Sequence, residues 1–405
     1  MSLTKRIELG LLFWREAGLD AIILFKASLR RTQPERDQLV KNSRIMLAAA
    51  LLVAVLGPIA DAQSSQDNPK PTQYANLTGL HDFDSLVGQW RTHHRRLKER
   101  LAGSHEWVEF GGTFDFRLLM GGLVNVDDSV YEAPDGAYRG IGLSAYDSKT
   151  GQWAIWGLDG RTPFGALDPT NIGRFENGVG TFYCDDTLRG KPIRVRFIWS
   201  NITATSAHFE QAFSPDSGTT WETNWITDFE RVTAHDSQDT PSSTKNANMS
   251  GLHDFDFLIG QWQVHHRRLK ERLANSHDWM GFEGTLTTRQ LMDGWANMGD
   301  NLFKMPGGDV RGVSLRSYDP KTGQWAVWWL DGRNPSANLD PPIKGHFENG
   351  VGTFYADDTL RGKPIRVRVT WSQITPRSAR WEQAFSPDGG KTWETNWITE
   401  FRRVS

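Results

Sequence analysis

Short runs of alternating apolar and polar residues, separated by turn residues, recur along most of the chain. Ala145–Trp156 reads as a strand, a D-x-x-T-G turn and a second strand. Ala207–Phe213 and Trp221–Phe229 read as two further strands, joined by the turn sequence SPDSGTT. This spacing is typical of antiparallel all-β sandwiches and barrels. The expected helices are short and lie near Phe83–Val87 and around Leu97–Ala102.

The whole pattern occurs twice, at a constant offset of 172 residues. GQWRTHHRRLKERL begins at Gly88, and GQWQVHHRRLKERL begins at Gly260. The same offset aligns residues 76–232 with residues 248–404 without a gap, and roughly two-thirds of the aligned positions are identical. Each copy has the size of a single domain. The chain is therefore a tandem duplication, with domains at 76–232 and 248–405.

Polar, turn-rich segments flank the two copies. Residues 233–247, TAHDSQDTPSSTKNA, have no periodicity and are rich in Ser and Thr, and residues 63–75 are similar in character. Both segments are predicted to be linkers.

The N-terminal region has the pattern of a secretory signal peptide. Met46–Leu56 is apolar but too short to span a bilayer, basic residues precede it, and Ala60-Asp61-Ala62 provides a cleavage site. We expect a signal peptide at residues 40–62, with cleavage after Ala62. Residues 1–39 are expected to be a non-native or unstructured extension. This pattern predicts a periplasmic or secreted protein with no stable membrane span after cleavage.

Differences between the copies indicate which side chains face inward. In the last strand Asp228 and Glu230 become Glu400 and Arg402, a change that an exposed face tolerates. The alternate positions, among them Trp225 and Arg231, are then expected on the inner face. In the first strand the inward residues are expected to be Trp90, Thr92, His94 and Arg96.

FDSLVGQW and FDFLIGQW, at residues 83–90 and 255–262, resemble the opening of a lipocalin-like barrel of the calycin superfamily. The resemblance implies that the Gly-x-Trp tryptophan packs beneath an arginine of the final strand, as structural pairs Trp90–Arg231 and Trp262–Arg403. Each copy also resembles a widespread bacterial lipocalin-like family of unknown function, through YDPKTGQWA and SPDGGKTWETNW. That family implies a barrel with an interior cavity and no established reaction. We therefore predict two consecutive lipocalin-like antiparallel β-barrels.

The favoured function is binding of a small, partly hydrophobic molecule inside each barrel. A few polar groups in an aromatic cavity are the usual composition of such a site. The ligand-binding residues predicted are His94, Arg96, Gln211 and Trp225, with their counterparts His266, Arg268, Gln383 and Trp397. Because both copies keep these residues, the sequence does not rank them. The alternatives are an isomerase, cyclase or hydratase using the same cavity, and an envelope or carbohydrate-binding protein using exposed tryptophans.

Composition and motifs argue against several other classes. The formal net charge of -2 does not favour nucleic-acid binding. His93 and His94 are adjacent on a strand and point to opposite sides, so they do not favour a metal site. The haem-binding nitrobindin pattern is incomplete, because GQWRTHH lacks its further glycines. SPDSGTTWE matches the Asp-box, which is usually a structural hairpin. No metal or cofactor is predicted, and the oligomeric state is left open.

Overall fold

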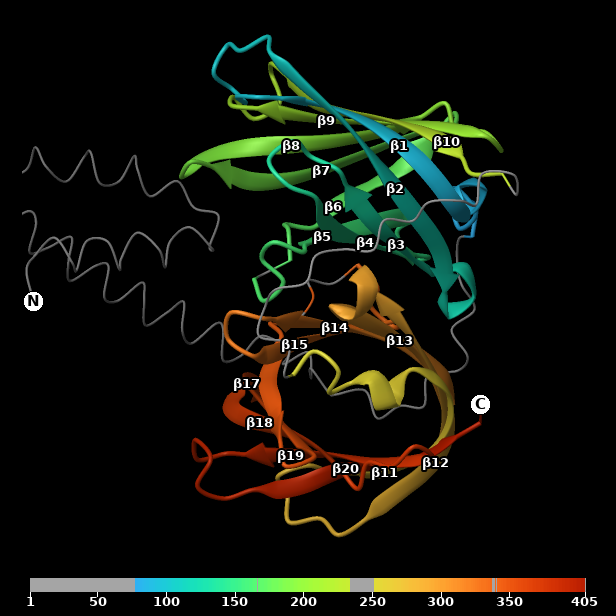
Figure 1. The fold of residues 1–405 in the computed structure, drawn as a ribbon. Coiled ribbons are helices and arrows are strands. Elements are labelled where there is room, and N and C mark those ends of the chain that lie inside the picture. Colours follow the sequence, from blue (N-terminus) through green and yellow to red (C-terminus); the bar gives the residue numbers. More distant parts are fainter. Residues whose placement is uncertain (1–76, 166, 234–250, 337–338, 340, 405) are drawn as a thin grey trace, which may run out of the picture. The chain divides into compact units, whose positions relative to one another are not determined.

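The computed structural model describes residues 77–165, 167–233, 251–336, 339 and 341–404 (Figure 1). The predicted N-terminal extension, the signal peptide and the linker at 63–75 lie outside the described residues. So does nearly all of the linker at 233–247.

The first copy forms a closed barrel in which each strand pairs with the next along the chain and β1 pairs with β10. All of these pairings are antiparallel, and Figure 1 shows the resulting ring of strands. A 3-10 turn, η1 (Asp84–Leu86), precedes the barrel, and a second, η2 (Met120–Gly122), follows β2. The strands are β1 (Gly88–Leu97), β2 (Trp107–Leu119), β3 (Val124–Tyr131), β4 (Tyr138–Asp147), β5 (Gln152–Asp159), β6 (Asn171–Glu176), β7 (Val179–Leu188), β8 (Lys191–Ser200), β9 (Ser206–Ser214) and β10 (Glu222–Arg231).

The second copy repeats this topology as a separate closed barrel, with β11 paired to both β12 and β20. Its 3-10 turns are η3 (Asp256–Leu258) and η4 (Met292–Gly294). The strands are β11 (Gly260–Leu269), β12 (Trp279–Leu291), β13 (Ala296–Met305), β14 (Gly308–Asp319), β15 (Gln324–Asp331), β16 (Ile343–Glu348), β17 (Val351–Leu360), β18 (Lys363–Ser372), β19 (Ser378–Ser386) and β20 (Glu394–Arg403).

The predicted fold class, all-β with two closed antiparallel barrels, is confirmed. Each barrel has ten strands, whereas lipocalin barrels have eight, so the lipocalin resemblance remains a prediction. The short helix expected near Phe83–Val87 is present as η1. The helix expected around Leu97–Ala102 was wrong, because β1 extends to Leu97 and bends follow it. None of the helices in the described ranges has the length and apolar character that crossing a membrane requires.

Side chains alternate between the two faces of the strands, as the sequence predicts. Trp90, Thr92 and His94 are buried along β1, and the residues between them are exposed. In β10, Thr227 and Phe229 are buried, whereas the outward-facing Asp228 and Glu230 are exposed. This period of two makes one face of the sheet the inner wall of the barrel.

Aromatic side chains and the η1 turn close one end of the first barrel. Phe83 is buried and meets Trp153 edge to face, with ring centroids 5.0 Å apart. The Trp90 indole N–H donates to the Leu86 carbonyl at 2.7 Å. Trp153 likewise donates to the Gly79 carbonyl at 3.1 Å. These bonds fix η1 and the preceding residues over this end.

An arginine of the last strand holds the same end together. The Arg231 guanidinium lies 4.1 Å from the Trp90 ring and donates to the carbonyls of Ser85, Val87 and Ala204. Gly88 has φ +121°, and a Cβ there would lie 2.7 Å from the Arg231 Nη1 atom. The glycine of Gly-x-Trp therefore leaves room for the arginine. The second barrel repeats the arrangement, with Arg403 4.3 Å from Trp262.

Replacing Arg231 with methionine should loosen this closed end selectively. The change keeps much of the aliphatic packing but removes the bonds to three carbonyls and the cation–π contact, a loss of about 2 kcal/mol. Hydrogen–deuterium exchange of the β1 and β10 amides should then be roughly 30-fold faster. The exposed neighbour change Glu230→Gln is the matched control. Equal exchange in the two variants would contradict the role given to Arg231.

Candidate functional site

The first barrel encloses a cavity of about 250 Å³. Its lining includes Tyr131 at the end of β3, Tyr138 at the start of β4 and Asp159 at the end of β5, and we call this end of the cavity its mouth. The inner-face residues that line it include Thr92, His94, Phe114, Asp127, Ser129, Tyr131, Tyr138, Gly140, Gly142, Ile155, Gly157, Asn171, Gln211, Trp225 and Thr227. The wall is thus aromatic, with several polar groups.

One row of residues across three strands borders this cavity. Asp127 on β3 pairs with Gly142 on β4, which pairs with Gly157 on β5. A Cβ at Gly142 would lie 2.0 Å from Asp127 Oδ2, so the missing side chain makes room for the carboxylate. A Cβ at Gly157 would lie 2.5 Å from Asp168 Oδ2, at the rim.

The corresponding row of the second barrel has a bulky side chain at one of its three positions. Gly299, Ser314 and Trp329 stand at the positions of Asp127, Gly142 and Gly157, in the same register. The indole of Trp329 lies directly against Gly312, where a Cβ would meet it at 2.2 Å. It also packs edge to face on Phe303, with centroids 5.9 Å apart. The first barrel has Gly157 at the position of Trp329, so no indole enters its cavity there; the Asp168 carboxylate lies over Gly157, and Tyr131 lies against Gly140.

Asp127 places a carboxyl group in the cavity wall. Its Oδ1 accepts a hydrogen bond from the Ser129 hydroxyl at 2.9 Å. Burial raises the pKa of Asp127 to about 6, and repulsion from Asp128 adds to that rise, against the bonds from Ser129 and the Gly142 backbone. The nearby Tyr131 hydroxyl also has a raised pKa, mainly through burial. A carboxyl group with this pKa changes its protonation state only slightly below neutral pH.

Four buried polar atoms of cavity-lining residues lack a hydrogen-bond partner in the described structure, on Tyr138, Arg139, Trp156 and Asn171. The Tyr138 hydroxyl and the Asn171 Oδ1 atom are both buried without a hydrogen bond. Tyr138 stacks on Tyr131 with ring centroids 4.7 Å apart. Asn171 is 3% exposed, and its amide nitrogen donates to the Pro169 carbonyl. Buried polar atoms are usually paired, so both are candidates for contact with a ligand or water.

His94, the first predicted site residue, lines the cavity, but both its ring nitrogens have protein partners. Its Nδ1 atom lies 2.9 Å from the Thr227 hydroxyl and accepts from the Trp225 indole N–H at 3.3 Å. Because an indole can only donate, Nδ1 carries no proton and Nε2 is the donor to the Thr92 hydroxyl at 2.9 Å. Burial lowers the pKa of His94 to about 3. The neutral imidazole orients Trp225.

Trp225 is itself a predicted residue, and the remaining two, Gln211 and Arg96, lie beside it. Gln211 pairs with Trp225 across β9 and β10, and its amide donates to Asn224 Oδ1 at 2.9 Å. Gln211 and Trp225 both line the cavity. The Arg96 guanidinium lies 5.5 Å from the Trp225 ring, at the mouth rather than in the wall. The structure therefore brings all four residues together.

The predicted residues of the second barrel occupy equivalent places with one difference. His266 accepts from Trp397 at 3.3 Å, Arg268 lies 5.2 Å from the Trp397 ring, and Gln383 pairs with Trp397. Val264 replaces Thr92, and the His266 Nε2 atom consequently has no hydrogen-bond partner. The pKa of His266 is lowered to about 3, chiefly by burial.

Several residues of the cavity were not predicted from the sequence, namely Asp127, Tyr131, Tyr138, Gly157 and Asn171. They differ between the copies, becoming Gly299, Phe303, Val310, Trp329 and Ile343. A comparison of inward positions could have found them, but it requires the cross-strand register. Within the described ranges, no group of three His, Cys, Asp or Glu side chains is arranged to hold a metal ion.

No protein-family model and no curated protein matches this chain. Among solved structures, it is similar to a DUF3598-family protein of unknown function from Nostoc punctiforme, at 11% identity and a TM-score of 0.26. That match covers 81% of this chain and 99% of the other. A redesigned β-barrel matches 38% of this chain and 96% of its own, at 10% identity and a TM-score of 0.23. Scores this low carry no argument about function.

Asp127→Asn should stabilise the protein at neutral pH. The folded pKa of Asp127, about 6, lies above that of an unfolded aspartate. The native state therefore binds the extra proton, and Asp127 costs stability as pH rises from about 4 through 6. The variant should be more stable by about 1 to 3 kcal/mol at pH 7.5, with the difference disappearing near pH 4. Urea unfolding across this pH range measures the effect.

The exposed turn residue Asp135, changed to asparagine, is the matched control and should have the stability of the wild type at pH 7.5, because its side chain is exposed. If Asp127→Asn also followed the wild type, the buried placement of this carboxyl group would be contradicted.

Proposed function

We propose that the protein binds one small, partly hydrophobic molecule per chain, inside the first barrel. The observation that carries the proposal is the difference between the two barrels in one row of inward residues that cross three strands at the same register. Asp127, Gly142 and Gly157 border the cavity, whereas Trp329 takes the position of Gly157 in the second barrel. A carboxyl group in a largely apolar wall costs stability, and its place beside a cavity is typical of a binding or catalytic site.

The composition of the cavity supports a binding role. Aromatic rings form much of its wall, and the polar groups between them include Asp127, Asn171 and the Tyr138 hydroxyl. Such a combination holds an apolar body and selects its orientation by hydrogen bonds. In this account the second barrel is a filled counterpart that does not take the ligand.

An enzyme that transfers a proton is the second candidate, and Asp127 favours it. A general base works best with a pKa near the operating pH, and the pKa of Asp127 is about 6. His94 does not suit that role, because its ring nitrogens are engaged with Thr92, Thr227 and Trp225. If the protein is an enzyme, Asp127→Asn should abolish turnover of a bound substrate while leaving its affinity within a few-fold.

The Gly-x-Trp arrangement supports, as a proposal, a distant relation to lipocalin-like proteins. Arg231 over Trp90 and Arg403 over Trp262 have the geometry that the resemblance implies. The role of these four residues is structural in either case.

Export is a further part of the proposal, supported by the apolar segment 46–56 and the Ala60-Asp61-Ala62 site. Expression of the full chain in a Gram-negative bacterium should yield a periplasmic protein that begins at Gln63. N-terminal sequencing of the periplasmic fraction measures this. A mature protein that retains residues before Ala62 would contradict the proposed cleavage.

Gly157→Trp should close the first barrel. It introduces the side chain found at the equivalent position, 329, and should abolish binding of the neutral fluorescent probe N-phenyl-1-naphthylamine. The wild type should bind one probe molecule per chain, measured by fluorescence titration and native mass spectrometry. Because Tyr131 lies against Gly140, the triple variant Gly157→Trp/Tyr131→Phe/Tyr138→Val provides a second test, with the side chains of the other copy at these three positions.

Trp329→Phe, which keeps an aromatic ring in the second barrel, is the control and should bind the probe as the wild type does. Thermal unfolding of each variant verifies that it is folded. Two probe molecules per wild-type chain, or unchanged binding in a folded closed variant, would overturn the proposal.

A further inference from the structure

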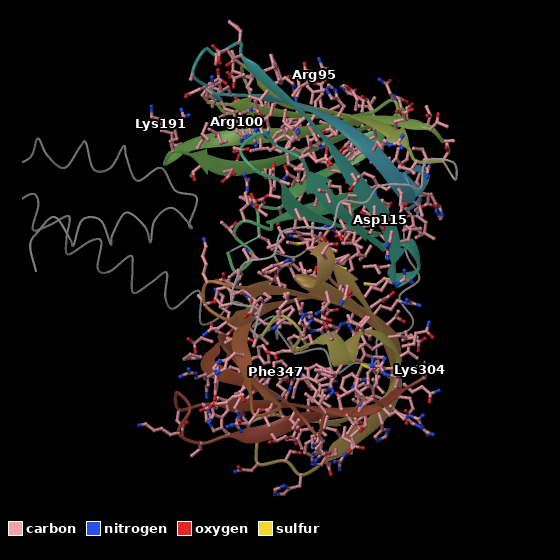
Figure 2. The ribbon with its side chains drawn as sticks, viewed as in Figure 1. Arg95, Arg100, Asp115, Lys191, Lys304 and Phe347 are labelled. Atoms are coloured by element: carbon pink, nitrogen blue, oxygen red, sulfur yellow. The ribbon has the colours of Figure 1, made fainter. Side chains whose placement is uncertain are left out.

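Three arginines gather at the mouth of the first barrel. The Arg96 guanidinium lies 5.5 Å from the rings of both Phe110 and Trp225. Arg100, labelled in Figure 2, belongs to the segment after β1. Its guanidinium lies 5.9 Å from the same Trp225 ring. Arg161 follows β5 and lies 3.9 Å from the Tyr138 ring. Stacked tyrosines connect these positions, because Tyr131 contacts both Tyr138 and Trp225.

The charges of these arginines are unequally compensated. Arg161 has its own carboxylate partner, Asp159, at 2.5 Å. In the part of the chain that the structure describes, neither Arg96 nor Arg100 has such an ion pair. Glu222 is the acidic group that favours the charge of Arg100, but it accepts the Leu101 backbone N–H at 2.7 Å. Burial lowers the pKa of Arg100, as do the positive charges of Arg96 and Arg161.

The Tyr138 hydroxyl lies in the field of the same three arginines. Burial raises the pKa of Tyr138, while Arg161, Arg96 and Arg100 act to lower it. The hydroxyl is buried, lines the cavity and has no hydrogen-bond partner among the residues that the structure describes. It is therefore an unused donor beside two partly desolvated positive charges, which is the environment that stabilises a bound anion.

From this arrangement we infer that the ligand of the first barrel carries an anionic group, such as a carboxylate or sulfonate. That group binds at the mouth to Arg96, Arg100 and the Tyr138 hydroxyl, while the apolar body lies in the cavity below. The inference rests on the proposed function and adds the chemical class of the ligand, an amphipathic aromatic or alicyclic acid. Asp127 and Asn171, deeper in the wall, would accept hydrogen bonds from donors on its far end.

The second barrel keeps part of this arrangement. Arg268 and Arg272 correspond to Arg96 and Arg100, and Arg268 lies over Trp397 in the same way. Val310 replaces Tyr138, so the hydroxyl donor is missing. With Trp329 below this mouth, the apolar body of a ligand has no place there. The second pair of arginines is consequently a matched control rather than a second site.

Two fluorescent probes of one skeleton test the inference. 8-Anilinonaphthalene-1-sulfonate carries a sulfonate that N-phenyl-1-naphthylamine lacks, and their dissociation constants are measured with the full chain by fluorescence titration. In the double variant Arg96→Met/Arg100→Met, affinity for the sulfonate probe should fall about tenfold or more, with less than about twofold change for the neutral probe. Tyr138→Phe should also lower the affinity for the sulfonate probe but not the affinity for the neutral probe. In the wild type, higher salt should lower the affinity for the sulfonate probe alone.

Arg268→Met/Arg272→Met should leave both affinities unchanged. If the Arg96/Arg100 variant lost affinity for both probes equally, these arginines would serve to pack the mouth, and the inference would be overturned. Unchanged affinity for the sulfonate probe in that variant would also overturn it. Either result leaves the proposed function intact if the neutral probe still binds in the wild type and is lost in Gly157→Trp. Failure of both probes to bind the wild type would instead contradict the proposed function, and the inference would fall with it.

Discussion

A ring of ten hydrogen-bonded strands encloses more space than an eight-stranded barrel, and inward side chains have to fill it. Every second residue of each strand contributes to that filling. In the second barrel Trp329, Trp381 and the buried Arg316 stand where the first has Gly157, Phe209 and Ser144. The first barrel leaves part of its interior unfilled, and polar as well as aromatic side chains line that space. Interiors are normally close-packed, so an open region lined by polar atoms points to a ligand.

The two interiors also carry opposite charges. Asp127 lies in the wall of the first barrel, with a pKa raised to about 6. Arg316 is buried inside the second, where it donates to Asn297 and the Ser314 hydroxyl, and burial lowers its pKa to about 9. Each charge lowers the stability of its own barrel unless it is compensated. Two copies that began with one sequence thus have different interior chemistry, while both keep the same closed end of tryptophan, arginine and 3-10 turn.

The fold was predictable because its signals are local. Alternation, turn residues and the offset of 172 residues indicate antiparallel barrels, and Gly-x-Trp indicates the closed end. The cavity was not predictable, because Asp127, Gly142 and Gly157 form a row only through the register of three strands. His94 was predicted as a ligand contact on its type and face. Its engagement by Thr92, Thr227 and Trp225 depends on neighbours brought in by β10.

The most direct test of the central claim is a crystal structure of the chain soaked with N-phenyl-1-naphthylamine. The account predicts electron density for one probe molecule inside the first barrel, against Gly157 and Tyr131, with Trp329 undisplaced in the second. Density inside the second barrel in place of the Trp329 indole, or density on outer surfaces alone, would contradict it.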